Sequence, residues 1–144
     1  MILQKKYIII FLLISSTGLF GQMTSPGVET CKSEFDSLAN RLVYTKVDSM
    51  PTFPNGEDSL YAFISKNIKI VGGNATYSGT VYVSFIIETD GSLTNKRLIK
   101  GFYCPADEEV LRLIDIMPDW IPGKCEGILV PVKFIFPLKF NVEF

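Results

Sequence analysis

One stretch of strict alternation constrains the fold of this chain more than any other feature. Between residues 80 and 88, apolar side chains occupy every second position: Val81, Val83, Phe85 and Ile87. This pattern is typical of a strand with one buried face. Asp90-Gly91 follows, and a second β-like run covers residues 93–100. Because glycine tolerates the positive φ of tight hairpin turns, an Asp-Gly step between two such runs predicts an antiparallel hairpin.

Two further segments have the apolar spacing of amphipathic helices. In residues 57–68 the apolar positions follow an i, i+3, i+4, i+8 pattern, set by Leu60, Phe63, Ile64 and Ile68. A second apolar stripe begins after three acidic residues at 107–109 and ends at Pro118, which cannot continue a helix. We interpret the acidic residues as partners of a helix N-terminus rather than as acid–base catalysts. The sequence therefore predicts helices over 57–68 and 107–117.

The last strand is expected over residues 128–140, where Val130, Val132, Phe134 and Phe136 alternate with other side chains. Pro131 and Pro137 cannot donate ladder hydrogen bonds, so part of this strand is expected at a sheet edge. The order helix, strand, strand, helix, strand predicts an α+β fold of two layers. In it, two helices cover one face of a three-stranded antiparallel sheet.

The first 21 residues have the composition of a secretory signal peptide. Lys5 and Lys6 precede the apolar run from Tyr7 to Ile14, which is 8 residues long. A membrane-spanning helix needs about 20 apolar residues, so we expect cleavage after Gly21, with an uncleaved anchor as the alternative.

Residues 22–45 are expected to form a linker that contains a short helix. The helical spacing is set by Phe35, Leu38, Ala39 and Leu42, although residues 42–47 could instead extend as a strand. The domain proper is then residues 46–144.

Composition excludes several classes of function. The chain has no histidine, which excludes Ser-His and Cys-His catalysis and histidine-bearing zinc sites. Three scattered cysteines are too few for a four-cysteine metal site. We therefore expect no catalytic residue, no metal and no cofactor. Without residues 1–21 the chain has 12 basic and 15 acidic residues, a net charge of −3, which argues against a nucleic-acid partner.

Two side-chain types need separate interpretation. Trp120 lies between Pro118 and Pro122, and we expect it to pack the returning segment onto the second helix, with recognition of a partner as the alternative.

Cys104 and Cys125 flank the second predicted helix. If the segment after the helix runs back along it, the two thiols lie at one end of the sheet. We therefore hypothesise a Cys104–Cys125 disulfide that closes a loop of about 20 residues and leaves Cys31 over.

Several phrases together resemble the C-terminal domain of TonB-like energy transducers from Bacteroidota. The most specific is M-P-D-W-I-P-G-K at residues 117–124; the others are V-Y-T-K-V-D-S-M-P-T-F-P-N-G at 43–56, G-T-V-Y-V-S-F at 79–85, D-G-S at 90–92 and D-E-E-V-L-R at 107–112. The resemblance covers residues 43–140. The sequence departs from the family at Asn55, where a glycine is usual, and at 70–75. It also shows neither the membrane anchor nor the proline-rich spacer of the transducers.

The resemblance implies a binding mode and a set of partners. Domains of this family bind the TonB box of outer-membrane receptors by adding it as a strand to a sheet edge. Here the edge would be residues Leu129, Val130, Pro131, Val132, Lys133, Phe134, Ile135 and Phe136, with Phe53 and Lys133 flanking the peptide. The partners would be a TonB-dependent receptor and, if the chain is anchored, the ExbB/ExbD motor of energy-coupled transport. A soluble periplasmic adaptor uncoupled from that motor is the alternative, and a homodimer through exposed edges is a further expectation.

Overall fold

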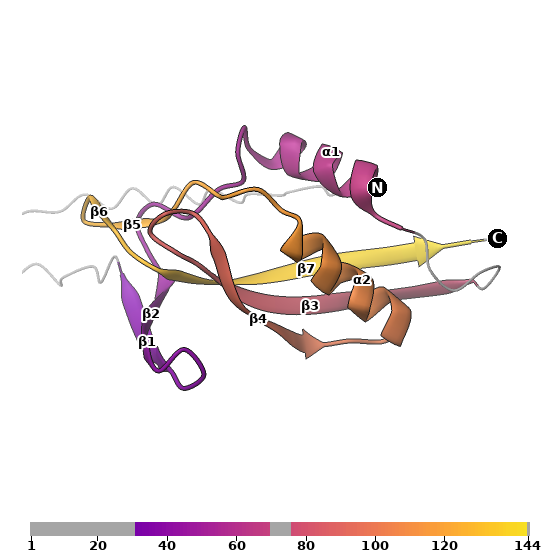
Figure 1. Cartoon of the computed structure of the whole chain (residues 1–144), viewed down its shortest axis with the longest axis horizontal. Coiled ribbons are helices and arrows are strands. Elements are labelled where there is room, and N and C mark those ends of the chain that lie inside the picture. The colour runs from indigo at the N-terminus through magenta and orange to yellow at the C-terminus, as the bar shows by residue number, and fades with distance from the viewer. Residues whose placement is uncertain (1–30, 70–75, 144) are drawn as a thin grey trace, which may run out of the picture.

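The computed structural model describes residues 31–69 and 76–143, so the predicted signal peptide and the linker up to residue 30 lie outside it. Within these ranges the fold is α+β, with two helices, a five-stranded sheet and a two-stranded ribbon (Figure 1). The order in the large sheet is β1-β2-β7-β3-β4. The predicted fold class is confirmed, but the sheet is mixed and larger than the three antiparallel strands expected.

The predicted hairpin is confirmed as β3 (Tyr77–Ile87) and β4 (Leu93–Lys100), which pair antiparallel. Gly91 adopts a φ of 89° in the turn. The Asp90 carboxylate accepts hydrogen bonds from the backbone N–H and the hydroxyl of Ser92, at 2.9 and 2.6 Å. An acidic side chain that caps its own turn in this way fixes the hairpin register locally.

Both helices lie on one face of the sheet (Figure 1). The first, α1 (Glu57–Asn67), matches its prediction closely. The second, α2 (Cys104–Asp115), begins three residues earlier than predicted, because Pro105 occupies the first turn, where a missing N–H has no cost. The core between helices and sheet contains buried apolar side chains of both layers, among them Ile64, Val83, Phe85, Val110, Leu113 and Phe136.

The last strand is not an outermost strand in the order of the sheet. β7 (Val132–Val142) pairs antiparallel with β3 over eleven positions, from Tyr77 with Val142 to Ile87 with Val132. On its other side, β2 (Arg41–Lys46) runs parallel to it and meets it at one position, Tyr44 with Val132. The prediction of an edge strand is therefore wrong at the start of β7, where two strands from the predicted linker region extend the sheet.

The predicted short helix of residues 35–42 is also wrong, because β1 (Lys32–Asp36) and β2 form a hairpin there. The Asp36 carboxylate accepts the backbone N–H groups of Leu38 and Ala39 at 3.1 and 3.0 Å, and Asn40 has a positive φ of 52°. These contacts stabilise a turn instead of a helix. The alternative prediction of a strand over residues 42–47 is confirmed.

The hairpin folds across the sheet face that the helices leave open. There Asp36 pairs with Arg97 of β4, Arg41 pairs with Glu88, and Glu34 pairs with Lys133 of β7 at 2.8 Å. Ser84 and Ile86 of β3 are buried beneath it. Three acidic and three basic side chains thus hold the hairpin on the sheet.

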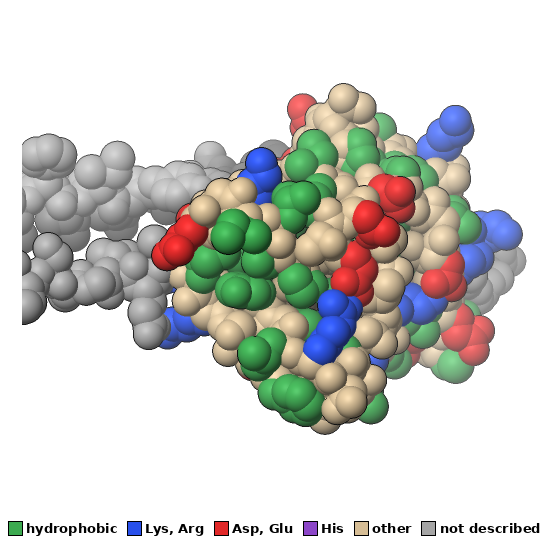
Figure 2. Space-filling model, turned by 60° about the vertical axis from the view of Figure 1, so that its left-hand side comes forward, with side chains coloured by type: hydrophobic (Ala, Val, Ile, Leu, Met, Phe, Trp, Pro, Cys, Tyr) green, Lys and Arg blue, Asp and Glu red, His purple; other side chains and the backbone are tan. Residues whose placement is uncertain are grey.

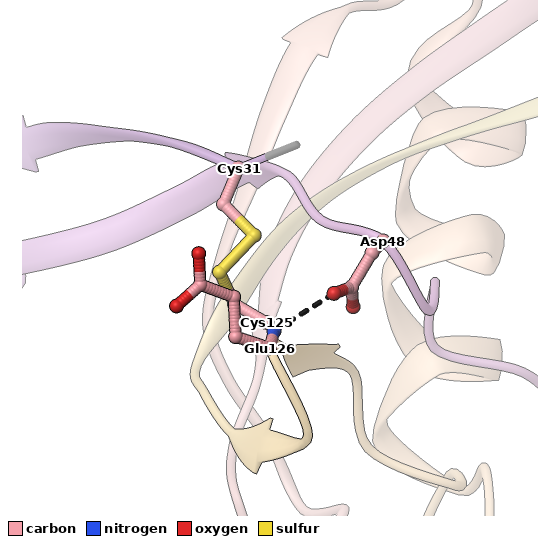
Figure 3. The surroundings of a disulfide bond; sticks show 4 residues. All are labelled: Cys31, Asp48, Cys125 and Glu126. Atoms are coloured by element: carbon pink, nitrogen blue, oxygen red, sulfur yellow. Dashed lines mark hydrogen bonds between the residues drawn. A yellow bond between two sulfur atoms is a disulfide. The ribbon is translucent and has the colours of Figure 1, made fainter. Parts of the chain in front are cut away.

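The disulfide joins Cys31 to Cys125, 94 residues apart, and not Cys104 to Cys125 (Figure 3). Cys104 is an exposed free thiol at the start of α2. After α2 the chain does not turn back along the helix but continues away to β5 (Lys124–Cys125) and β6 (Ile128–Leu129), at the other end of the molecule (Figure 1). β1 begins at that end, which brings Cys31 to Cys125.

Candidate functional site

The side of β7 that faces away from β3 is open beyond Val132. The Tyr44 N–H donates to the Pro131 carbonyl at 2.9 Å, and after Lys46 the chain leaves the sheet. Residues 49–52 pair instead with the segment after α2, at Ser49 with Lys124 and Thr52 with Ile121. In the part of the chain that the structure describes, no strand pairs with residues 133–142 on this side. A row of backbone N–H and C=O groups is therefore left without a strand partner.

Two hollows flank this open edge at the position where β2 leaves it. The first, on the helix side, has a volume of about 370 Å³ and is lined by Met50, Pro51, Thr52, Phe53, Gly56, Glu57, Leu60, Trp120 and Phe134. The second, on the opposite face, also has about 370 Å³ and is lined by Glu34, Thr45, Met50, Lys133, Phe134 and Ile135. Both contain Met50 and Phe134. The two hollows therefore lie at the same position along the edge, one on each face of the sheet.

A third, smaller hollow lies at the far end of β7. It has about 190 Å³ and is lined by Ile68, Lys69, Tyr77, Lys139, Phe140, Asn141 and Val142. Lys69 and Lys139 contribute two cationic side chains to its lining, so this hollow has a positive rim. Because Tyr77 of β3 also lines it, this hollow lies over the paired ends of β3 and β7.

The structure divides the predicted edge residues between three environments. Leu129 belongs to β6 and pairs with Lys124, away from the open edge. Val130, Pro131 and Val132 lie beside β2, and both valines are buried. Lys133, Phe134, Ile135 and Phe136 lie in β7 beyond β2, where the edge is open. Only this second half of the predicted set is available to an added strand, and residues 137–142 extend it.

The two aromatic candidates, Phe53 and Trp120, both line the helix-side hollow. Trp120 is 4% exposed and packs edge-on against Phe53, with ring centroids 5.7 Å apart. Phe53 is 5% exposed and also contacts Phe63 of α1. Trp120 is therefore packed in the core, as expected, with ring contacts to Phe85 of β3 and Phe134 of β7 besides Phe53; its expected contact with the second helix stays a prediction. Phe53 lies in the wall of the hollow, as buried support and not as an exposed contact.

Electrostatics at the start of the open edge are set by the β1–β2 hairpin. The hydrogen bond to Glu34 raises the pKa of Lys133, and Asp36 adds to this effect. Backbone N–H groups of the turn, with Ala39 first, and the Arg97 guanidinium lower the pKa of Asp36 to about 2. Lys133 is therefore engaged with two carboxylates, and the flanking role predicted for it would require it to share them with a partner.

Sequence reasoning misses Glu34 and Thr45 as residues of this site, because it assigns residues 22–45 to a linker. It also misses Met50, which it places in the domain but beside no strand. The Met-Pro-Thr-Phe-Pro phrase is the available signal, since two prolines keep residues 50–54 extended and out of the sheet. Nothing in the local sequence indicates that this segment borders the last strand.

Other site types are not found in the described ranges. These residues contain no group of three or more side chains that could hold a metal ion. No helix among them is long and apolar enough to cross a membrane. No protein-family model matches the chain, and neither a curated protein nor a solved structure is significantly similar to it.

Proposed function

We propose that this protein is a TonB-like, partner-binding protein of the cell envelope. It takes up the extended TonB box of an outer-membrane receptor as an added strand on the open edge of β7, and so takes part in energy-coupled transport. One observation carries the proposal: β7 is paired along its whole length by β3 but at a single position by β2. The rest of that edge is a template for a further strand.

The hollows fit an occupant in the extended conformation. Side chains of a strand alternate between the two faces of a sheet. Neighbouring residues of a peptide that continues the line of β2 would therefore enter the helix-side hollow and the opposite hollow in turn. Backbone hydrogen bonds would supply affinity that is independent of sequence, and the hollows would supply selectivity.

The phrases that carry the resemblance to TonB-like domains meet at this edge. The segment 49–52 and the segment 121–124 pair with each other through Ser49–Lys124 and Thr52–Ile121. Residues 50–53 and Trp120 supply much of the wall of the helix-side hollow. The parts of the sequence with the most specific resemblance are thus the parts that shape the proposed site.

The direct test is a titration of the isotope-labelled protein with TonB-box peptides from receptors of the same organism, followed through backbone amide shifts. Strand addition predicts shifts concentrated at residues 133–142 and 50–60, with little change in β4. A scrambled peptide of the same composition is the control. Shifts confined to β4, or none at millimolar peptide, would contradict the proposal.

A matched pair of variants separates this edge from the rest of the surface. Met50 borders both hollows and is 46% exposed, and Leu98 on β4 is 44% exposed. Met50→Asp places a carboxylate between the two hollows and should weaken peptide binding about tenfold or more, which corresponds to about 1.4 kcal/mol. Leu98→Asp should leave the affinity unchanged. Equal losses for the two variants would indicate nonspecific binding.

Coupling to the ExbB/ExbD motor is a separate part of the proposal. An adaptor with the same edge would bind the same peptides without the motor. Cross-linking in intact cells distinguishes the two: adducts with ExbB or ExbD identify a transducer. Receptor adducts alone identify the adaptor.

A further inference from the structure

The β1–β2 hairpin has an outer face, which carries the pairs Phe35–Leu42, Ser33–Tyr44 and Lys32–Lys46 and is opposite the face with Glu34 and Asp36. The composition of this outer face changes from the turn of the hairpin to its base. At the turn, Leu38 is 67% exposed. The next cross-strand pair is Phe35 with Leu42, each 61% exposed. Exposed side chains of this size, gathered on one protruding element, are unusual on a protein surface that faces only water.

The same face becomes more polar toward the base of the hairpin. Ser33 pairs with Tyr44, which is half-buried because it packs against Val47, Val130 and Val132. A register shift between Lys32 and Ser33 then brings Lys32 opposite Lys46. Both lysines are exposed, and no acidic side chain of the described residues forms an ion pair with either. From turn to base the order is leucine, phenylalanine with leucine, tyrosine, and two lysines.

The acidic groups of the hairpin point to its other face. Glu34 and Asp36 pair with Lys133 and Arg97 on the sheet, and Arg41 pairs with Glu88. Residues 37–40, which form the turn, carry no charge. The outer face is therefore apolar at its turn and carries two lysines at its base, where Asp48 and Glu126 are also exposed beside the disulfide (Figure 3). The acidic residues of the hairpin itself are paired on its other face.

We propose that this outer face docks on an anionic phospholipid bilayer. The polarity gradient matches the depth profile of a membrane interface, in which apolar side chains enter the acyl region, tyrosine lies at the headgroups and lysines meet anionic phosphates. Leu42 and Lys46 are separated by about 13 Å of strand, at about 3.3 Å per residue. The flexible lysine side chains can span the remaining depth.

The position of the hairpin allows this contact. Its turn projects from one end of the molecule, on the side away from α1 (Figure 1). Hydrophobic side chains gather in several groups on the end that carries β1, β2, β5 and β6 (Figure 2). The Cys31–Cys125 disulfide holds the base of the hairpin to β5, so the docking face is fixed relative to the domain. Docking does not use the open edge of β7, so it stands independently of the proposed function.

Depth-dependent fluorescence quenching in the full chain tests the proposal, whatever residues 1–30 contribute to binding. A Leu38→Trp variant is mixed with vesicles of phosphatidylcholine and phosphatidylglycerol that carry brominated acyl chains. We expect its emission to fall more than about twofold, as for a side chain in the acyl region. Ile99→Trp, at a position 55% exposed on β4, is the matched control and should not be quenched. The signal of Trp120, which is buried, is subtracted using the unmodified chain.

The outcomes separate the proposal from its alternatives. Equal quenching at the two positions, or none at either, overturns it. An emission shift of Leu38→Trp that grows with protein concentration without vesicles also overturns it, since a second copy would then cover the face. Lys32→Gln combined with Lys46→Gln should reduce the quenching of Leu38→Trp. Undiminished quenching in vesicles of phosphatidylcholine alone would overturn the role of the two lysines.

Discussion

Trp120 and Gly91 meet backbone to backbone. The Trp120 N–H donates to the Gly91 carbonyl at 2.8 Å, and a Cβ atom at position 91 would lie 2.0 Å from the Trp120 carbonyl oxygen. The turn of the β3–β4 hairpin and the segment after α2 therefore fit together only if residue 91 has no side chain. This contact positions the indole that forms part of the helix-side hollow.

Gly91→Ala should destabilise the protein by about 2–4 kcal/mol, because it adds a backbone clash to a positive φ. Gly127→Ala is the matched control: Gly127 has a φ of 77°, but no neighbouring atom lies within 4 Å of where its Cβ would be, so the change should cost about 1 kcal/mol. Urea denaturation measures both. Equal losses would show that the contact with Trp120 is not what excludes a side chain at 91.

Removing the disulfide should lower stability substantially, since it closes a loop of 94 residues. In the chain-entropy treatment, Cys31→Ser costs about 4–5 kcal/mol. Cys104→Ser changes an exposed free thiol and should cost little. Thiol titration of the unreduced, unfolded protein should find one free thiol, and peptide mapping should assign it to residue 104. Three free thiols would contradict the assignment.

Acid should release the β1–β2 hairpin through Asp36. The pKa of this carboxyl is lowered from 3.8 to about 2 in the folded protein, chiefly by the Ala39 N–H and by Arg97. Its stabilising contribution is therefore complete above about pH 4 and is lost as the pH falls toward 2. Asp36→Asn should be less stable than the unmodified protein at pH 7, and the two should converge near pH 2. Asp119→Asn, at an exposed position, should show no such convergence.

Glu109 should hold the end of α1 against α2. Its buried carboxylate accepts the Lys69 N–H at 2.7 Å and the Arg112 guanidinium at 2.8 Å, and Arg112 also donates to the Asn67 carbonyl. Glu109→Gln should cost about 1–3 kcal/mol, the range for a hydrogen bond with a charged partner. Faster amide hydrogen exchange at Lys69 would show that the loss is local. Glu108→Gln, one residue away and exposed, should leave that amide unchanged.

The elements that the sequence predicts well are those whose signal is local. Alternation from Val81 to Ile87, the Asp90-Gly91 turn and the apolar stripe of α1 each lie within a few residues, and the structure confirms each of them. The position of Trp120 in the core follows from its size and apolarity.

What the sequence does not predict depends on contacts between distant segments. Phe35, Leu38 and Leu42 have helical spacing, but the Asp36 carboxylate accepts hydrogen bonds from the turn that follows it and from Arg97, 61 residues away. These contacts stabilise a hairpin there instead of a helix. The partner of Cys125 depends on where β1 begins, which no local pattern indicates. The open edge of β7 likewise depends on the point at which β2 leaves it. The candidate edge is therefore in the expected strand, but it begins and ends later than the sequence indicates.

The disulfide also determines how the molecule would respond to mechanical load. A pull on the chain before Cys31 passes through the sulfur–sulfur bond to Cys125, and from there through β6 into β7. The hairpin, both helices and the β3–β4 pair lie in the bypassed loop and are not stretched by it. A strand bound along β7 would receive the tension directly, as shear along its hydrogen-bonded ladder.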